Sequence, residues 1–129
     1  MSSEAFEYLD LDDLLLLAAV LLGDPPPVRD LGLLAAAVAR PKASAFGDDA
    51  YPDVWSKAAA LLHSIVKNHA LVDGNKRLGW VASAVFFDLN GVDPTAASND
   101  DVFGLVMRVA AEAIEVTELA EQLRAILEG

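Results

Sequence analysis

The stretch that decides the fold is residues 54–91, VWSKAAALLHSIVKN followed by HALVDGNKR and then LGWVASAVFFDLNG. In its first part, apolar side chains recur at the spacing of one helix face, at Val54, Ala58, Leu61, Leu62, Ile65 and Val66. This pattern predicts a helix with Pro52 in its first turn, where a missing backbone amide is harmless. We expect the helix to end near His69 or Ala70.

The second part of the stretch predicts another helix, from about Asn75 to Asn90, with Gly91 as its C-terminal stop. Helices are also expected on both sides of this pair, because apolar periodicity follows a capping residue in each case. Their expected ranges are 11–22 after Asp10, 31–38 after Asp30, about 99–113 after Ser98 or Asn99, and a last helix to about residue 127 capped by Thr117. Residues 41–51 show no periodicity and predict a loop or a small hairpin. The expected fold is therefore all-α, a compact helical bundle that forms a single domain over residues 1–129.

Composition narrows the classes of function. The chain has 129 residues and no cysteine, so we expect a cytoplasmic protein without disulfides or a thiolate zinc site. Its longest apolar run, residues 14–23, is shorter than the roughly 20 residues of a membrane span. The formal net charge of −11 repels nucleic acid and anionic lipid at long range. We therefore expect no direct nucleic-acid partner and no membrane partner, but a basic protein or a small ligand in a locally basic pocket.

The concentrated positive charge of this acidic chain lies around the joint between the two central helices. Lys67, Lys76 and Arg77 are within eleven positions of one another. Lys76 and Arg77 fall in the predicted first turn of a helix, where unpaired amides and aligned peptide dipoles are already partly positive. Two cations there are unfavourable unless an anion docks on the helix end. Gly74 would let the backbone approach a phosphate closely, so the pattern predicts an anion-binding site.

Three more side chains near this helix start have functional groups that can accept a proton, bind a metal ion or bind a phosphate. His69 extends the apolar stripe of its helix by one turn, so we expect it on the inner face, and imidazole accepts a proton near neutral pH. Asp73 suits magnesium bound together with phosphates, and the amide of Asn75 can donate to phosphate oxygens. Alone, each residue is more often a core histidine, a cap or a turn. Their joint spacing predicts phosphoryl or nucleotidyl transfer to a hydroxyl group.

The nonamer His69-Ala70-Leu71-Val72-Asp73-Gly74-Asn75-Lys76-Arg77 resembles the Fic family motif, H-x-F-x-[DE]-[GA]-N-[GK]-R. The ending Asn-Lys-Arg is the version of the Doc toxins within that family. The likeness extends over residues 8–125 and includes the segment 28–34. One position departs from the motif, because Leu71 stands where the family has an aromatic residue. We expect Leu71 to pack the loop against the bundle in its place.

The resemblance implies a role for each matched residue. His69 would be the general base that takes the proton of a target hydroxyl. Asp73 would bind Mg²⁺ together with the phosphates of ATP. Gly74, Asn75 and the following helix amides would form the anion hole, and Arg77 would clamp a phosphate.

Lys76 decides the reaction that the resemblance implies. Family members that transfer AMP carry a glycine there, which leaves room for a phosphate. In Doc toxins a lysine fills that room, the nucleotide binds in reverse, and the γ-phosphate is transferred to a threonine of translation elongation factor Tu. With Lys76, the chain resembles the kinase branch, which stops translation; AMP transfer is the alternative.

The resemblance also implies partners. Residues 41–51 align with a family flap that docks the target peptide as an added strand, and Ser44, Ala45 and Phe46 are the candidate docking residues. The family's inhibitory motif [ST]-x-x-x-E-[GN] is not matched, because Arg124 stands where Ser or Thr should precede Glu128-Gly129. A cognate antitoxin would then restrain the toxin from outside. Two other functions stay open: a catalytically weak partner-binding module, and a plain helical bundle in which the nonamer is coincidental.

Overall fold

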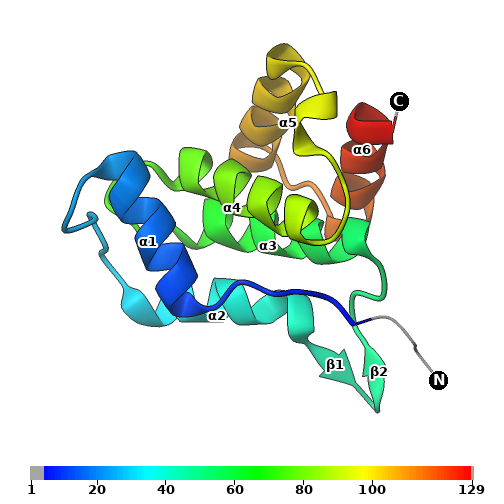
Figure 1. The fold of residues 1–129 in the computed structure, drawn as a ribbon, viewed down its shortest axis with the longest axis horizontal. Coiled ribbons are helices and arrows are strands. Elements are labelled where there is room, and N and C mark those ends of the chain that lie inside the picture. Colours follow the sequence, from blue (N-terminus) through cyan, green and yellow to red (C-terminus); the bar gives the residue numbers. More distant parts are fainter. Residues whose placement is uncertain (1–4, 129) are drawn as a thin grey trace.

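The computed structural model describes residues 5–128, so Gly129 of the inhibitory-motif comparison lies outside the described residues. These residues form a helical bundle with one small hairpin (Figure 1), and the all-α prediction is confirmed. The helices are α1 (Leu11–Leu22), α2 (Leu31–Ala39), α3 (Val54–Asn68), α4 (Asn75–Leu89), α5 (Asn99–Ala111) and α6 (Val116–Glu128). The strands are β1 (Ser44–Ala45) and β2 (Asp48–Asp49), and short 3₁₀ turns cover Arg40–Lys42 and Pro94–Ala96. Within residues 5–128, none of the helices combines the length and apolar character that a membrane span requires.

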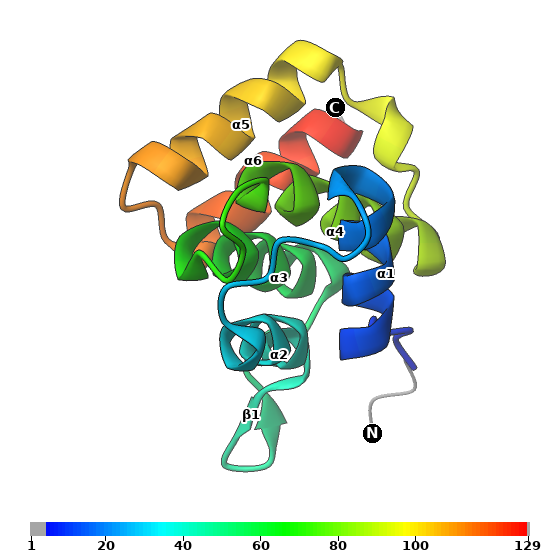
Figure 2. The same ribbon diagram turned by 90° about the vertical axis from the view of Figure 1, so that its left-hand side faces the viewer.

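Helix α3 is the centre of the bundle, with α2, α4 and α6 packed around it (Figures 1 and 2). Five consecutive side chains, residues 58–62, are all buried, although they point in every direction around the helix. A helix that is apolar on all sides has to be enclosed by other elements. The nonamer follows the C-terminal end of this central helix.

The contact between α3 and α4 is close because α4 carries a glycine where it meets α3. A Cβ atom on Gly79 would lie 2.9 Å from Val66 Cγ2 and 3.1 Å from Leu62 Cδ1. Neither neighbour can move freely, because both side chains are buried in the core. Gly79 thus sets the spacing of the two helices that carry the nonamer between them.

The predicted loop or hairpin is a hairpin, and it lies at the N-terminal end of α3 (Figure 1). Lys57 joins it to this helix: its side chain is fully buried, and its Nζ donates to the carbonyl oxygen of Pro41 and to an Asp49 carboxylate oxygen at 3.4 Å. The rings of Phe6 and Tyr8 lie 4.9 and 5.5 Å from the same ammonium group. The cation thus joins the hairpin, α3 and the N-terminal segment.

Several helix boundaries differ from the sequence prediction by one or a few residues. Pro52 lies outside α3, because the side chain of Asp53 accepts the Ser56 amide at 2.8 Å and caps the helix. Helix α6 begins at Val116, so Thr117 is inside the helix rather than its cap. Helix α5 ends at Ala111, two residues earlier than expected, while Ser98 caps its start as one of the two predicted alternatives.

A polar cluster fixes the start of the hairpin segment against the middle of α3. The Arg40 guanidinium donates to Ser64 Oγ at 2.9 Å and to the Tyr51 hydroxyl at 2.9 Å, and it lies 3.1 Å from His63 Nδ1. Burial lowers the pKa of His63 below its ordinary value of 6.5, and the charges of Arg40 and Lys67 lower it further. Glu115 and the backbone of Ile114 oppose this shift without reversing it. The neutral imidazole is therefore the form that the fold selects.

The cluster predicts an acid-dependent loss of stability. Because the pKa of His63 is lower in the folded than in the unfolded chain, the unfolded chain binds more protons between the two values. The stabilisation is complete above pH 6.5 and is lost as the pH falls through the folded-state pKa. Urea unfolding at pH 7.5 to 5 should show a steeper loss for the parent than for His63→Gln, which keeps an acceptor for Arg40. Parallel curves would show that His63 does not titrate in this way.

The packing at Gly79 predicts a helix–helix contact that does not tolerate one methyl group. Gly79→Ala should lower the free energy of unfolding by about 1–3 kcal/mol, because buried neighbours have to shift. Gly104→Ala is the matched control, because Gly104 also lies within a helix and its added Cβ has no atom within 4 Å. That substitution should stabilise by about 0.5–1 kcal/mol through helix propensity. Equal effects in chemical denaturation would contradict the proposed close contact.

Candidate active site

The start of α4 differs from the starts of α1, α2, α3 and α5 in how its amides are used. An Asp or Ser side chain accepts a first-turn amide at the starts of α1, α2, α3 and α5. Helix α4 instead follows Gly74, and no side chain caps it. The backbone amides of Asn75, Lys76 and Arg77 therefore have no partner within their helix. Since both cationic side chains in this turn are exposed, the helix end is suited to an anion.

His69 does not continue the apolar stripe of α3, as the sequence had suggested. It is the C-cap of the helix, with φ 51° and ψ 45°, and its side chain is exposed. The left-handed backbone ends the helix one residue before His69 and turns the side chain out of the buried stripe. The prediction of an inner-face position was wrong, because helical periodicity cannot anticipate the residue at which the helix stops.

The loop after His69 is closed by Asn75. The Asn75 Oδ1 accepts the Leu71 amide at 3.0 Å, and its Nδ2 donates to the Leu71 carbonyl oxygen at 3.0 Å. Leu71 itself is 1% exposed, so it packs the loop against the bundle as predicted. The side chain of Asn75 thus holds the loop, and what this residue offers to an anion is chiefly its backbone amide. Its predicted role as a side-chain phosphate donor is revised accordingly.

A second segment, between α1 and α2, lies alongside the loop and was not recognised from the sequence as part of the site. The Ala70 carbonyl oxygen accepts the amides of Arg29 and Asp30, and the Val72 amide donates to the Pro27 carbonyl oxygen at 2.8 Å. The Arg29 guanidinium donates to the carbonyl oxygen of His69. Arg29 therefore holds the backbone of His69 and adds a cation beside the loop.

Gly74 is required both by the backbone and by packing. Its φ is +86°, in the left-handed region, and an added Cβ would lie 2.6 Å from Leu22 Cδ2. Helix α1 thus packs against the loop at the residue that precedes α4. The glycine allows the chain to turn from the loop into the helix while α1 covers it.

All six matched motif residues line one pocket of about 560 Å³: His69, Asp73, Gly74, Asn75, Lys76 and Arg77. In the part of the chain that the structure describes, neither Lys76 nor Arg77 forms an ion pair. Lys67 does not join them, because its Nζ donates to the Glu112 carbonyl oxygen at 2.8 Å and it does not line the pocket. The pocket is of a size that takes small ligands.

Asp73 is placed to share a cation with a bound phosphate, but not to hold one in an all-protein cage. One of its carboxylate oxygens accepts the Gly74 amide at 2.8 Å, and the side chain is exposed in the pocket. Among residues 5–128, no group of three or more His, Asp or Glu side chains is arranged to bind a metal. Magnesium commonly binds through one or two carboxylates, waters and substrate phosphates, so this single carboxylate fits Mg²⁺ delivered with a nucleotide.

The structure does not bring the three predicted flap residues to this pocket. Ser44, Ala45 and Phe46 lie in the hairpin at the N-terminal end of α3, whereas His69 caps its C-terminal end (Figure 1). A helix of 15 residues is about 22 Å long. A peptide docked on the hairpin would have to cover that distance to reach the imidazole. The segment that does border the loop is residues 27–30.

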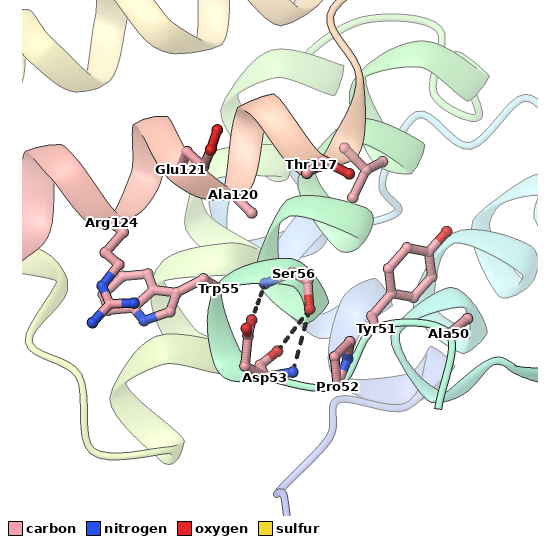
Figure 3. Close-up of a pocket in the computed structure, with 11 residues that line it drawn as sticks. Ala50, Tyr51, Pro52, Asp53, Trp55, Ser56, Thr117, Ala120, Glu121 and Arg124 are labelled. Carbon is pink, nitrogen blue, oxygen red and sulfur yellow. Dashed lines mark hydrogen bonds between the residues drawn. The ribbon is translucent and has the colours of Figure 1, made fainter. Parts of the chain in front are cut away.

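A smaller pocket of about 360 Å³ lies between the start of α3 and α6 (Figure 3). Two of its polar side chains, Asp53 and Ser56, are engaged in the capping hydrogen bonds at the start of α3. Arg124 lies over the Trp55 ring and pairs with Glu128 at 2.8 Å. Because no matched motif residue lines this pocket, the pocket at the start of α4 is the candidate active site.

Comparison with known proteins identifies the family of the chain. The model of the Fic/DOC family matches residues 8–87, which include the nonamer. The chain is 48% identical over 118 residues to the curated protein Toxin Doc of Mycolicibacterium smegmatis, strain ATCC 700084 / mc(2)155. This match covers 91% of the chain and 91% of Toxin Doc. The chain therefore belongs to the Fic/DOC family, and its pocket at the start of α4 carries the family's motif residues.

The geometry of Gly74 predicts a large effect of one added methyl group. Gly74→Ala should lower the free energy of unfolding by about 1–3 kcal/mol more than Gly91→Ala. The two glycines have nearly the same φ, +86° and +83°, but an added Cβ at Gly91 meets no atom within 4 Å. In a Leu22→Ala background the excess should disappear, because the overlapping side chain is gone. An excess that persists in that double-mutant cycle would contradict the contact with α1.

Proposed function

We propose that the chain is the toxin of a toxin–antitoxin pair and transfers the γ-phosphate of ATP to a hydroxyl group of a target protein. The observation that carries this proposal is that the uncapped start of α4, with Lys76 and Arg77, lines the same pocket as His69 and Asp73. Anion-binding groups, a proton acceptor and a carboxylate thus face one cavity. The family and the similarity to Toxin Doc support the toxin role.

In the proposed reaction, the target hydroxyl oxygen forms a bond to the γ-phosphorus of ATP. The bond from that phosphorus to its bridging oxygen breaks, and ADP leaves. His69 accepts the hydroxyl proton, and the first-turn amides of α4 with Arg77 stabilise the charge on the transferred group. Asp73 would hold Mg²⁺, which supplies positive charge to the phosphates when it is bound. Arg29, which does not line the pocket, would position His69 through its backbone carbonyl oxygen.

Lys76 supports γ-phosphate transfer over AMP transfer. It lies in the first turn of α4, lines the pocket, and is exposed with its charge unpaired by any carboxylate in residues 5–128. In the family, a glycine at this position leaves space that the AMP-transferring members use for a phosphate. A lysine fills that space and adds a cation, which favours the reversed nucleotide of the kinase branch.

The proposed target is a protein like translation elongation factor Tu, and phosphorylation of it would stop protein synthesis. The proposed restraint is a cognate antitoxin that binds the toxin. Both proposals come from the likeness to Doc toxins. The target would dock on the surface around the pocket and not on the hairpin, because Ser44, Ala45 and Phe46 lie about one helix length away from His69.

The test measures which phosphate of radiolabelled ATP is transferred to the target protein. With Mg²⁺, the purified chain should transfer label from γ-labelled ATP to elongation factor Tu, and His69→Ala should reduce transfer by about 10²-fold or more through loss of the base. The matched control is His63→Gln, the other histidine of the same segment, which lies outside the pocket and should leave transfer unchanged.

Other outcomes would support the competing functions. Label arriving only from α-labelled ATP would identify an AMP transferase. Growth arrest by His69→Ala that equals arrest by the parent would identify a partner-binding module instead of an enzyme. Absence of any binding of ATP or phosphate would contradict phosphoryl transfer and leave partner binding as the function of this Fic/DOC family member.

A further inference from the structure

Two large apolar side chains beside the motif loop are exposed to solvent. Val72, in the loop itself, is 70% exposed, and Leu31, the first residue of α2, is 51% exposed. Neither belongs to the hydrophobic core. Val72 also lines the same pocket as His69 and Asp73. Single exposed apolar side chains are ordinary on protein surfaces, so the feature to be explained is their position next to the reacting groups.

The segment between α1 and α2, which runs alongside the loop, determines where Val72 points (Figure 2). Val28 and Leu71 form an antiparallel bridge between the two segments. Successive side chains of such a pair point to opposite faces, and Leu71 is buried. Val72 and the residue opposite it, Pro27, therefore lie together on the outer face of the bridge.

Hydrogen bonds also hold the start of α2 close to this outer face. The Ala70 carbonyl oxygen accepts the Asp30 amide at 3.0 Å, and the Asn68 side chain donates to the Leu33 carbonyl oxygen at 3.4 Å. Leu31 lies between these two contacts in the sequence. Its exposed side chain is therefore held near the end of α3, next to the loop.

The acceptor of the proposed reaction has to approach across this face. Its hydroxyl oxygen must come within about 2.6–3.2 Å of the His69 imidazole, while the phosphates lie where α4 begins. In an in-line displacement the acceptor enters on the side of the phosphorus away from the leaving ADP. An extended chain advances about 3.3 Å per residue, so the residues next to the acceptor lie against the loop beside His69.

We propose that Pro27, Leu31 and Val72 form a loop patch that docks the target protein through an apolar residue within about two positions of the acceptor hydroxyl. The inference rests on the proposed function and names the class of acceptor: a hydroxyl flanked by an apolar side chain. An acidic flank would be repelled, because Asp30 and Asp73, the sequence neighbours of Leu31 and Val72, are exposed carboxylates. The patch is held by its own backbone, so docking costs little conformational entropy.

The nucleotide is the competing occupant, because Val72 lines the pocket that would hold it. Pro27 and Leu31 do not line that pocket, so the loop patch extends from the pocket onto the open surface. A protein segment covers such a surface, whereas a small ligand stays within the cavity. The target protein is therefore the occupant that accounts for all three side chains.

The test compares exposed apolar side chains inside and outside the loop patch. Val20 and Leu16 of α1 are 77% and 65% exposed, lie outside the core and line neither pocket, so they match Val72 and Leu31. Transfer from γ-labelled ATP to elongation factor Tu is measured at increasing target concentration. Val72→Ala and Leu31→Ala should each raise KM for the target roughly 4- to 15-fold, the effect of losing one or two buried methyl groups.

The controls separate docking from nucleotide binding and from chemistry. Val20→Ala and Leu16→Ala should leave KM for the target unchanged, and Val72→Ile, which keeps an apolar side chain, should stay close to the parent. The affinity of Val72→Ala for ATP with Mg²⁺ should equal that of the parent. Its kcat at saturating target should also be unchanged, because a uniform binding contact acts through KM. Thermal unfolding followed by circular dichroism checks that the variants fold.

Three results would overturn the inference, and they differ in what they mean for the proposed function. If Val72→Ala and Leu31→Ala keep the parent's KM, or lose no more than the α1 controls, the loop patch does not dock the target, and phosphoryl transfer stands. If weaker ATP binding accounts for the whole loss in Val72→Ala, that side chain belongs to the nucleotide site. If the parent transfers no label to the target, the docking inference and the proposed transfer are both wrong.

Discussion

Closure of the loop between α3 and α4 by a single asparagine is the constraint on which the site depends. Leu71 is buried, so its amide and carbonyl groups need partners, and an unpaired buried polar group costs about 1–3 kcal/mol. The Asn75 side chain provides one acceptor and one donor and satisfies both groups. A carboxylate of the same shape has no donor when it is ionised. This pairing fixes the start of α4 relative to the end of α3, and therefore relative to His69.

Other elements hold the same loop from outside. Residues 27–30 pair with its backbone, Arg29 binds the His69 carbonyl oxygen, and Leu22 packs on Gly74. The loop is thus positioned by α1, by the segment that follows it and by its own asparagine. Each contact uses the backbone of the loop. The side chains of His69, Asp73, Lys76 and Arg77 are consequently exposed in the pocket, while the chain that carries them is fixed.

Much of the fold could be predicted from local rules. Asp10 and Asp30 cap the helices that follow them, and the strong periodicity of residues 54–68 marked the central helix within two residues at its end. The position of the two cations at the start of α4 could also be predicted, because Lys76 and Arg77 fall in a first turn, where the helix dipole makes them unfavourable unless an anion binds. The structure adds that no side chain caps α4. The two cations therefore lie in the same turn as backbone amides that have no partner within the helix.

What could not be predicted depends on contacts distant in sequence or on where one helix stops. The outward turn of His69 follows from a left-handed C-cap, and nothing in the periodicity of α3 distinguishes that residue from one more helical turn. Arg29 lies 40 residues from the carbonyl group that it binds. The distance of Ser44, Ala45 and Phe46 from the pocket follows from the length of α3, which alignment to a motif does not measure.

The charge of the chain also has to be judged locally. A formal charge of −11 would repel a nucleotide if all charges acted together. At physiological ionic strength, however, exposed charges more than about 8 Å apart are largely screened from one another. The interactions that decide binding are then those inside the pocket, where Lys76, Arg77 and the first-turn amides outnumber the single carboxylate of Asp73. In the proposed function that carboxylate would be neutralised by Mg²⁺ bound together with the nucleotide, which would leave the pocket suited to a polyanion in an otherwise acidic protein.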